Sequence, residues 1–387
     1  MVFQATPEFA IKFTKLIALL GTSWPNYEGT PKWKLVIFQI RWWATFFLAI
    51  TACMTMCYAA HNQYQNILNL TKSLFDISNT SQTFVKMFFC KVHYKKMRYL
   101  LHDMEKYVEK AELHERELFV KYIKRCGKLH LTVMGSGLLI IHIIILAPLA
   151  LPQPFPNIAD YPFPIDGHPT YELLYLHQSC ATIHCLSIPA FDCQIALLLW
   201  YAGARLELLS DEFKNVTDDK QFAECVKKHQ YLLWYIQEIA ISSRGILAAT
   251  GCTCVLTAIS SGVHIVSNEP VPFKVPFMIS WVIVSSTLYI TSWPAENVLQ
   301  MCEKIGMSLY ESSWVQNSKE LNSGIIFVMQ RSQTPVTIEV PGILPVLSLR
   351  YFMMFLSRTF SYFTTLRVML DKIDINMDIP EEEQIPG

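Results

Sequence analysis

Ionisable side chains inside otherwise apolar stretches are the residues of this sequence that could do chemistry. His142 lies in LLIIHIIIL (Leu138–Leu146), while Asp76 and Asp192 interrupt two other apolar stretches. A charged group in hydrocarbon is costly, so such residues are candidates for function. His142 and Asp76 could each hydrogen-bond a ligand or a neighbouring helix. Asp192 lies deeper in its segment, which favours a structural ion pair or hydrogen bond over a role in transport.

His177, Cys180 and His184 share one face of a predicted helix and raise the question of a metal site. Such a site needs a fourth ligand and a second shell of partners. The sequence offers neither, so we expect no metal and no cofactor. The sequence also lacks a nucleophile elbow, a Walker loop, an HExxH motif and a pair of carboxylates at catalytic spacing. We therefore do not expect an enzyme.

Hydroxyl side chains gather in an apolar segment near the end of the chain, FLSRTFSYFTTLRVML (Phe355–Leu370). At about 100° per residue, one face of this segment collects Ser357, Ser361, Thr364, Thr365 and Val368. The opposite face collects Phe352, Phe355, Phe363 and Leu366. The hydroxyls could bond carbonyls of their own helix or a neighbouring helix. Alternatively, they could line a watery pathway built from several copies of the helix, which requires an oligomer.

The composition indicates that these residues belong to a membrane protein. Of the 387 residues, 52% are hydrophobic and 17% are charged, whereas soluble proteins carry about 25% charged residues. The net charge is zero, so we expect no nucleic-acid partner.

A bilayer core of about 30 Å needs roughly 20 apolar residues of helix. Seven segments meet or approach this requirement: 38–60, 67–89, 129–151, 173–202, 245–266, 275–295 and 343–370. The second of these is interrupted by Lys72, Asp76 and Lys86. We predict an all-α membrane protein with seven transmembrane helices, forming a single unit over residues 1–387.

Basic residues are distributed unevenly between the predicted loops. Twenty-five of the 32 Lys and Arg residues fall in one alternate set of loops, 1–36, 90–128, 204–244 and 295–350, against two in the other set. By the positive-inside rule the N-terminus is cytoplasmic and the C-terminus extracellular. A G-protein-coupled receptor has the reverse arrangement.

The same orientation predicts what lies on each side of the membrane. Charged residues at helical spacing predict that spans continue into a helical cytoplasmic anchor over 90–128, 204–244 and 296–342. Six prolines between residues 152 and 170 predict a rigid extracellular lid. The sequon at Asn69 would lie outside the cell, close to the membrane.

Several short motifs resemble those of the insect odorant receptors, and they occur in the order of that family. The motifs are Leu20–Pro25 (LGTSWP), Tyr171–Gln178 (YELLYLHQ), the stretch Ala295–Trp314, Arg331–Pro335 (RSQTP) and Ser361–Arg367 (SYFTTLR). Within an inverted seven-span chain of this length, the combination is specific to the insect olfactory receptor channel fold.

The resemblance implies an odorant-gated, non-selective cation channel in which four subunits surround a pore lined by the last helix. The chain lacks the long cytoplasmic insertion of the co-receptor Orco. It therefore resembles a tuning subunit that binds a small volatile organic ligand and assembles with Orco. The implied location is the plasma membrane of olfactory sensory neuron dendrites. A gustatory-type receptor channel, a G-protein-coupled chemoreceptor and a transporter remain alternatives.

Positions within the family imply two sets of functional residues. The odorant-binding candidates are Phe75, Asn79, Gly137, Ile141, His142, Ile145, Gln178, Ser179, Thr182, Trp281 and Tyr289. The pore and gate candidates are Ser357, Ser361, Thr364, Thr365 and Val368, with Thr365 and Val368 nearest the external constriction.

Overall fold

The computed structural model describes residues 6–65, 67–150, 153–157, 159–165, 167–268, 270–312 and 318–377. Trp314 of the Ala295–Trp314 motif, and Leu151 at the end of the predicted third span, lie outside these residues. The described chain is built of α-helices, with one isolated β-bridge between Val340 and Leu344. The helices are α1 (Pro7–Ala18), α2 (Lys32–Asn62), α3 (Ile67–Val92), α4 (Tyr94–Lys110), α5 (Leu113–Ala150), α6 (Thr170–His184), α7 (Ser187–Lys214), α8 (Asp219–Val266), α9 (Val271–Glu311), α10 (Lys319–Ser332) and α11 (Leu349–Met377).

Five of the predicted spans lie within single helices over the described residues. The fourth is interrupted between α6 and α7, and the last was predicted to begin at residue 343, whereas α11 begins at Leu349. Helices α2, α5, α8 and α9, and the pair α6–α7 taken together, are long and apolar enough to cross a membrane. Helices α3 and α11 carry the charged and hydroxyl side chains noted in the sequence, and they do not meet the same measure of length and hydropathy. The all-α fold is thus confirmed, whereas the seven-crossing topology stays a prediction.

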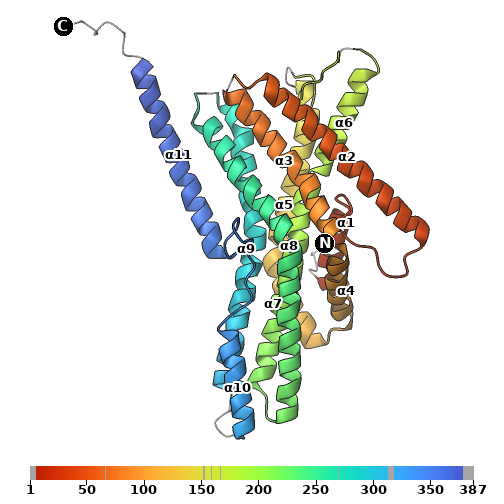
Figure 1. The fold of residues 1–387 in the computed structure, drawn as a ribbon, viewed down its shortest axis with the longest axis vertical. Coiled ribbons are helices and arrows are strands. Elements are labelled where there is room, and N and C mark those ends of the chain that lie inside the picture. Colours follow the sequence, from red (N-terminus) through yellow and green to blue (C-terminus); the bar gives the residue numbers. More distant parts are fainter. Residues whose placement is uncertain are drawn as a thin grey trace, which may run out of the picture.

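Long helices continue from the predicted spans into the predicted anchor. Helix α8 has 48 residues, which corresponds to about 72 Å at 1.5 Å per residue, more than twice a bilayer core of about 30 Å. Helices α7, α8 and α9 form the lower part of the molecule with α10, while α6 and the C-terminal end of α11 lie at the opposite end (Figure 1). The buried apolar core of the bundle continues into the anchor, where Phe213, Tyr235, Ile305 and Leu309 are buried.

The predicted fourth span is divided into two helices at Cys185 and Leu186. Pro189 has no N–H and its ring would clash with the carbonyl of Cys185 in a continuous helix. The Cys185 carbonyl, to which Pro189 cannot donate, accepts a hydrogen bond from the Ile188 N–H at 3.0 Å. The Ile188 carbonyl accepts one from Lys86 Nζ at 3.3 Å. The break places Cys185 and Leu186 in the interior of the bundle, where both line a cavity.

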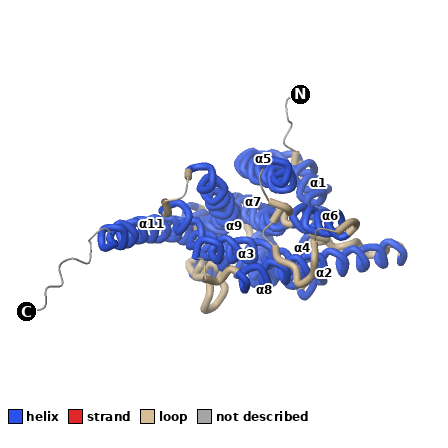
Figure 2. Tube along the Cα trace, turned by 90° about the horizontal axis from the view of Figure 1, so that it is seen from above, coloured by secondary structure: helices blue, strands red, loops and turns tan. Residues whose placement is uncertain are grey.

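Helix α11 projects from the side of the bundle (Figures 1 and 2) and is joined to it by aromatic packing. The ring of Phe352 lies 5.1 Å from that of Tyr289, and the ring of Phe363 lies 5.9 Å from that of Trp281. Gly262 of α8 permits this approach, because a Cβ atom there would lie 2.8 Å from the Phe363 ring. One face of α11 is therefore fixed against α8 and α9.

Candidate functional site

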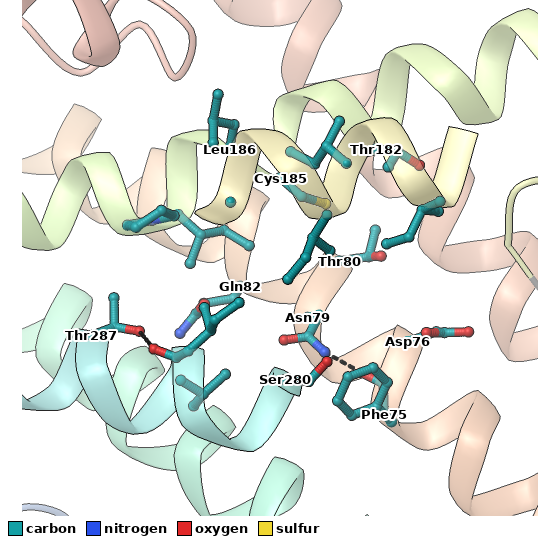
Figure 3. Close-up of a pocket in the computed structure, with 18 of the residues that line it drawn as sticks. Phe75, Asp76, Asn79, Thr80, Gln82, Thr182, Cys185, Leu186, Ser280 and Thr287 are labelled. Carbon is teal, nitrogen blue, oxygen red and sulfur yellow. Dashed lines mark hydrogen bonds between the residues drawn. The ribbon is translucent and has the colours of Figure 1, made fainter. Parts of the chain in front are cut away.

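A largely apolar cavity of about 180 Å³ lies between α3, α5, the α6–α7 break, α8 and α9. Figure 3 shows α3 contributing Phe75 and Asn79, the α6–α7 region contributing Thr182 and Cys185, and α9 contributing Thr287. The complete lining is Met56, Phe75, Asp76, Asn79, Thr80, Gln82, Val133, Gly137, Ile140, Ile141, Ile144, Asn157, Ala181, Thr182, Cys185, Leu186, Ile188, Pro189, Thr250, Ser280, Ile283, Val284 and Thr287. A cavity of about 150 Å³ takes up benzene, so this one accommodates a small organic molecule.

Five of the odorant-binding candidates line this cavity, namely Phe75, Asn79, Gly137, Ile141 and Thr182. At Gly137 an added Cβ atom would come within 3.1 Å of a methyl group of Leu186. Glycine at this position keeps α5 close to the α6–α7 break, so it shapes the cavity wall.

Two α5 candidates, His142 and Ile145, are not among the lining residues. His142 follows Ile141 by one residue and so points about 100° away from it around the helix. Its side chain is exposed, and Nδ1 lies 2.7 Å from the carbonyl oxygen of Leu138 in its own helix. The Ile145 carbonyl accepts a hydrogen bond from the Tyr175 hydroxyl at 2.6 Å, which joins α5 to α6.

Gln178 and Ser179 are buried next to the cavity, and Gln178 holds the predicted lid. The Asn157 backbone N–H donates to Gln178 Oε1 at 3.0 Å, and Gln178 Nε2 donates to the Tyr161 hydroxyl at 2.9 Å. Asn157 Nδ2 also donates to the Thr182 hydroxyl at 2.8 Å. The lid residue Asn157 thereby becomes part of the cavity wall. Asn157 carries no sequence signal of such a role beyond its place in the proline-rich segment.

The two α9 candidates, Trp281 and Tyr289, point toward α11 and not into the cavity. The cavity is instead lined by the α9 residues Ser280, Ile283, Val284 and Thr287, which recur at helical spacing. Position within the family suggested the two aromatic residues, whereas the rotation of α9 decides which of its residues face the cavity.

A buried ion pair lies beneath the cavity. Lys86 Nζ is 2.5 Å from Asp192 Oδ2, and both side chains are fully buried. The Thr250 hydroxyl donates to the other oxygen of Asp192 at 2.9 Å. Because Thr250 and Ile188 also line the cavity, this network forms part of its floor. The structural ion pair expected for Asp192 is confirmed, and its partner Lys86 was not identified from the sequence.

His177, one of the residues considered for a metal site, contacts a neighbouring helix instead. His177 Nε2 lies 2.8 Å from the Thr51 hydroxyl of α2. Across the described residues, no group of three or more His, Cys, Asp or Glu side chains is arranged to hold a metal ion.

The pore candidates lie on the uncovered face of α11. Thr364 and Thr365 both donate their hydroxyls to the Ser361 carbonyl oxygen at 2.8 Å. The side chains of Ser357, Ser361, Thr364, Thr365 and Val368 are exposed in the single chain, whereas Phe355 is buried. The hydroxyl stripe thus faces away from the α8–α9 contact.

The sequence profile of the 7tm Odorant receptor family matches residues 66–360. The chain belongs to this family. The matched region contains the cavity residues contributed by α3, α5, α6–α7, α8 and α9, together with the first half of α11. The family is one of receptors, in agreement with the expectation that the chain is not an enzyme.

Individual relatives and solved structures agree with the family assignment. The chain is 22% identical to Odorant receptor 10 of Aedes albopictus over 219 residues, covering 52% of this chain and 57% of that protein. It is 22% identical to Odorant receptor Or2 of Anopheles gambiae over 278 residues, covering 65% of this chain and 71% of that protein. The match therefore spans little more than half the length of the Aedes relative.

Two structures of the insect olfactory receptor OR5 from Machilis hrabei share the fold. The structure in complex with eugenol superposes with a TM-score of 0.78 at 18% sequence identity, covering 92% of this chain and 97% of that chain. The second structure of the same receptor gives a TM-score of 0.76 with the same identity and coverage.

Proposed function

We propose that this chain is the odorant-binding subunit of a ligand-gated, non-selective cation channel. It assembles with Orco subunits into a heterotetramer in the plasma membrane of olfactory sensory neuron dendrites. Its N-terminus is cytoplasmic and its C-terminus is extracellular. The ligand is a small volatile organic molecule, and the bilayer and permeant cations complete the set of partners.

The cavity supports the odorant-binding part of the proposal. Mostly apolar walls with a few hydrogen-bonding groups suit a small amphiphilic ligand, and the groups here include Asn79, Gln82, Thr182 and Thr287. The OR5 receptor of the same fold was solved with eugenol, a ligand of this general size and character.

The packing of α11 is the single observation that carries the channel part of the proposal. Phe352, Phe355 and Phe363 face the bundle, while Ser361 and Thr365 face away from it. Thr364 and Thr365 bond within their own helix, and the polar face as a whole favours a watery or protein environment over hydrocarbon at bilayer depth. Several copies of α11 around an axis would supply one as a water-filled pore.

The experiment is to record currents from cells that express this chain with Orco during application of a panel of volatile odorants. We expect an odorant-evoked cation current that persists when G-protein signalling is blocked. A current that disappears with the block would contradict the proposal. Cells expressing Orco alone serve as the control for ligand dependence.

The topology is tested separately with an epitope tag at the C-terminus. We expect antibody to bind the tag on intact cells, while a tag at the N-terminus binds antibody after permeabilisation alone. The opposite labelling would support a G-protein-coupled receptor arrangement.

A further inference from the structure

Asp76 is an acidic residue in the wall of the cavity that is not paired within the described part of the chain. It follows Phe75 on α3 and lines the cavity with Asn79 and Thr80. Figure 3 shows its carboxylate at the cavity edge without a bond to the residues drawn. Lys72, one helical turn earlier, is not at ion-pair distance in the described residues, although its positive charge acts on the carboxylate.

The other acidic groups near the cavity are already held by partners within the chain. Asp192 is held by Lys86 and by the Thr250 hydroxyl. The lid residue Asp160 accepts a hydrogen bond from Asn62 Nδ2 at 3.1 Å. Among the lining residues that the structure describes, Asp76 is thus the acidic side chain without a hydrogen bond or an ion pair.

A half-buried carboxylate in a largely apolar wall is unfavourable unless a donor or a cation reaches it. Within the described chain no group lies at hydrogen-bond or ion-pair distance, and the charge of Lys72 acts on Asp76 from farther away, so a closer partner can enter with the ligand. An ammonium group is the strongest match, since it brings both positive charge and N–H donors to the carboxylate. The neighbouring Phe75 ring can add a cation–π contact to the same group, and the volume of about 180 Å³ fits a hydrocarbon skeleton near the size of benzene.

We propose that Asp76 binds a protonated amino group, so that this receptor recognises small volatile amines. The inference rests on the proposed function for the location of the odorant site, and it adds the chemical class of the ligand.

The test uses three ligands with one skeleton, 2-phenylethylamine, 2-phenylethanol and ethylbenzene, on the full chain purified with Orco. Ligand binding is measured as thermal stabilisation of the complex, and channel opening is measured as current in cells. We expect the amine to bind more tightly than the alcohol and the hydrocarbon.

Asp76→Asn keeps the shape of the side chain and removes its charge. We expect this variant to weaken amine binding by about 10- to 100-fold, the range of a charge-assisted hydrogen bond, with a change of less than about threefold for the alcohol. Asp211→Asn is the matched control, because Asp211 is an exposed residue of the anchor with 68% side-chain exposure.

Three results would overturn the inference. The first is equal binding of amine and alcohol by the wild type. The second is unchanged amine binding by Asp76→Asn, and the third is an equal loss for both ligands, which would identify Asp76 as a neutral hydrogen-bond donor. If the channel function is wrong but the amine site is right, the amine will still bind in a manner that depends on Asp76, and no ligand-evoked current will be seen.

Discussion

Removal of one partner from the buried Lys86–Asp192 pair should strongly destabilise the receptor. The two side chains have no exposed surface, and they come from α3 and α7, which are far apart in the sequence. Lys86→Met leaves Asp192 with the single hydrogen bond from Thr250. Asp192→Leu leaves Lys86 with the carbonyl of Ile188. Either substitution therefore strands a charge in the interior.

The expected magnitude follows from this burial. Loss of one partner from a buried ion pair costs about 3–5 kcal/mol, whereas replacing both partners with apolar residues is close to neutral. At roughly 2 °C per kcal/mol for a large chain, each single substitution should lower the melting temperature by about 6–10 °C. The double variant Lys86→Met/Asp192→Leu should recover more than half of that loss.

The assay is a double-mutant cycle on the receptor purified with Orco in detergent, with the melting temperature followed by size-exclusion chromatography after heating. The control cycle uses Lys214 and Glu311, which form a 2.9 Å pair at the exposed end of the anchor. Exposed pairs contribute about 0–1 kcal/mol, so these variants should melt close to the wild type. A double variant at 86 and 192 that is as unstable as the worse single variant would refute the reasoning.

Three further predictions concern the pore, the lid and the anchor. Thr365→Cys should make the current sensitive to a water-soluble thiol reagent, whereas Phe355→Cys should not, because Phe355 is buried against the bundle. Currents recorded before and after addition of the reagent measure this sensitivity. Thr182→Val removes a hydrogen bond to the lid and should speed current decay after odorant washout by about 3- to 10-fold, while Thr132→Val, which alters an exposed bond within α5, should leave the decay unchanged. Burial lowers the pKa of His229 from its usual value of about 6.5 to about 4, so the unfolded chain binds more protons than the folded chain as the pH falls below about 6.5. The stability contributed by this group therefore falls by about 2 kcal/mol between pH 7.5 and pH 5. His229→Leu should reduce the acid-induced drop in melting temperature, and an identical drop would exclude this cause.

Helical periodicity was sufficient to predict features that depend on one helix. The hydroxyl stripe of α11 is an example, because angles around a single helix separate Ser361 and Thr365 from Phe355. The continuation of α8 from the anchor into a predicted span was also readable from its length and charge pattern. Such features require no knowledge of which helices are neighbours.

Features that depend on the rotation of one helix against another could not be predicted in the same way. The partner of Asp192 is Lys86, 106 positions earlier in the chain, and no spacing rule connects them. The family position of the odorant site points to α5, which does line the cavity, yet Ile141 faces the cavity while His142 next to it is exposed. The packing angle of each helix, which the sequence pattern does not define, decides between such neighbours.

Helix α9 is the element through which ligand binding can affect the pore helix. One of its faces contributes Ser280 and Thr287 to the cavity, and another places Trp281 against the rings of Phe360 and Phe363 on α11, at 5.4 and 5.9 Å. A ligand shifts the channel equilibrium to the extent that it binds the open and closed arrangements with different affinity. A rotation or displacement of α9 on binding would change both contacts together.

Substitution of Trp281 should therefore affect gating without affecting odorant binding. Trp281→Ala removes the aromatic contact with α11 and leaves the cavity lining intact, so we expect odorant affinity to change by less than about threefold while the maximal current falls several-fold. Single aromatic contacts are worth about 0.5–1.5 kcal/mol beyond their buried area, which is enough to move a two-state equilibrium by about 2- to 13-fold. Affinity is measured by thermal stabilisation of the purified complex and maximal current by saturating odorant. A loss of affinity equal to the loss of current would place Trp281 in the binding site and contradict a coupling role for α9.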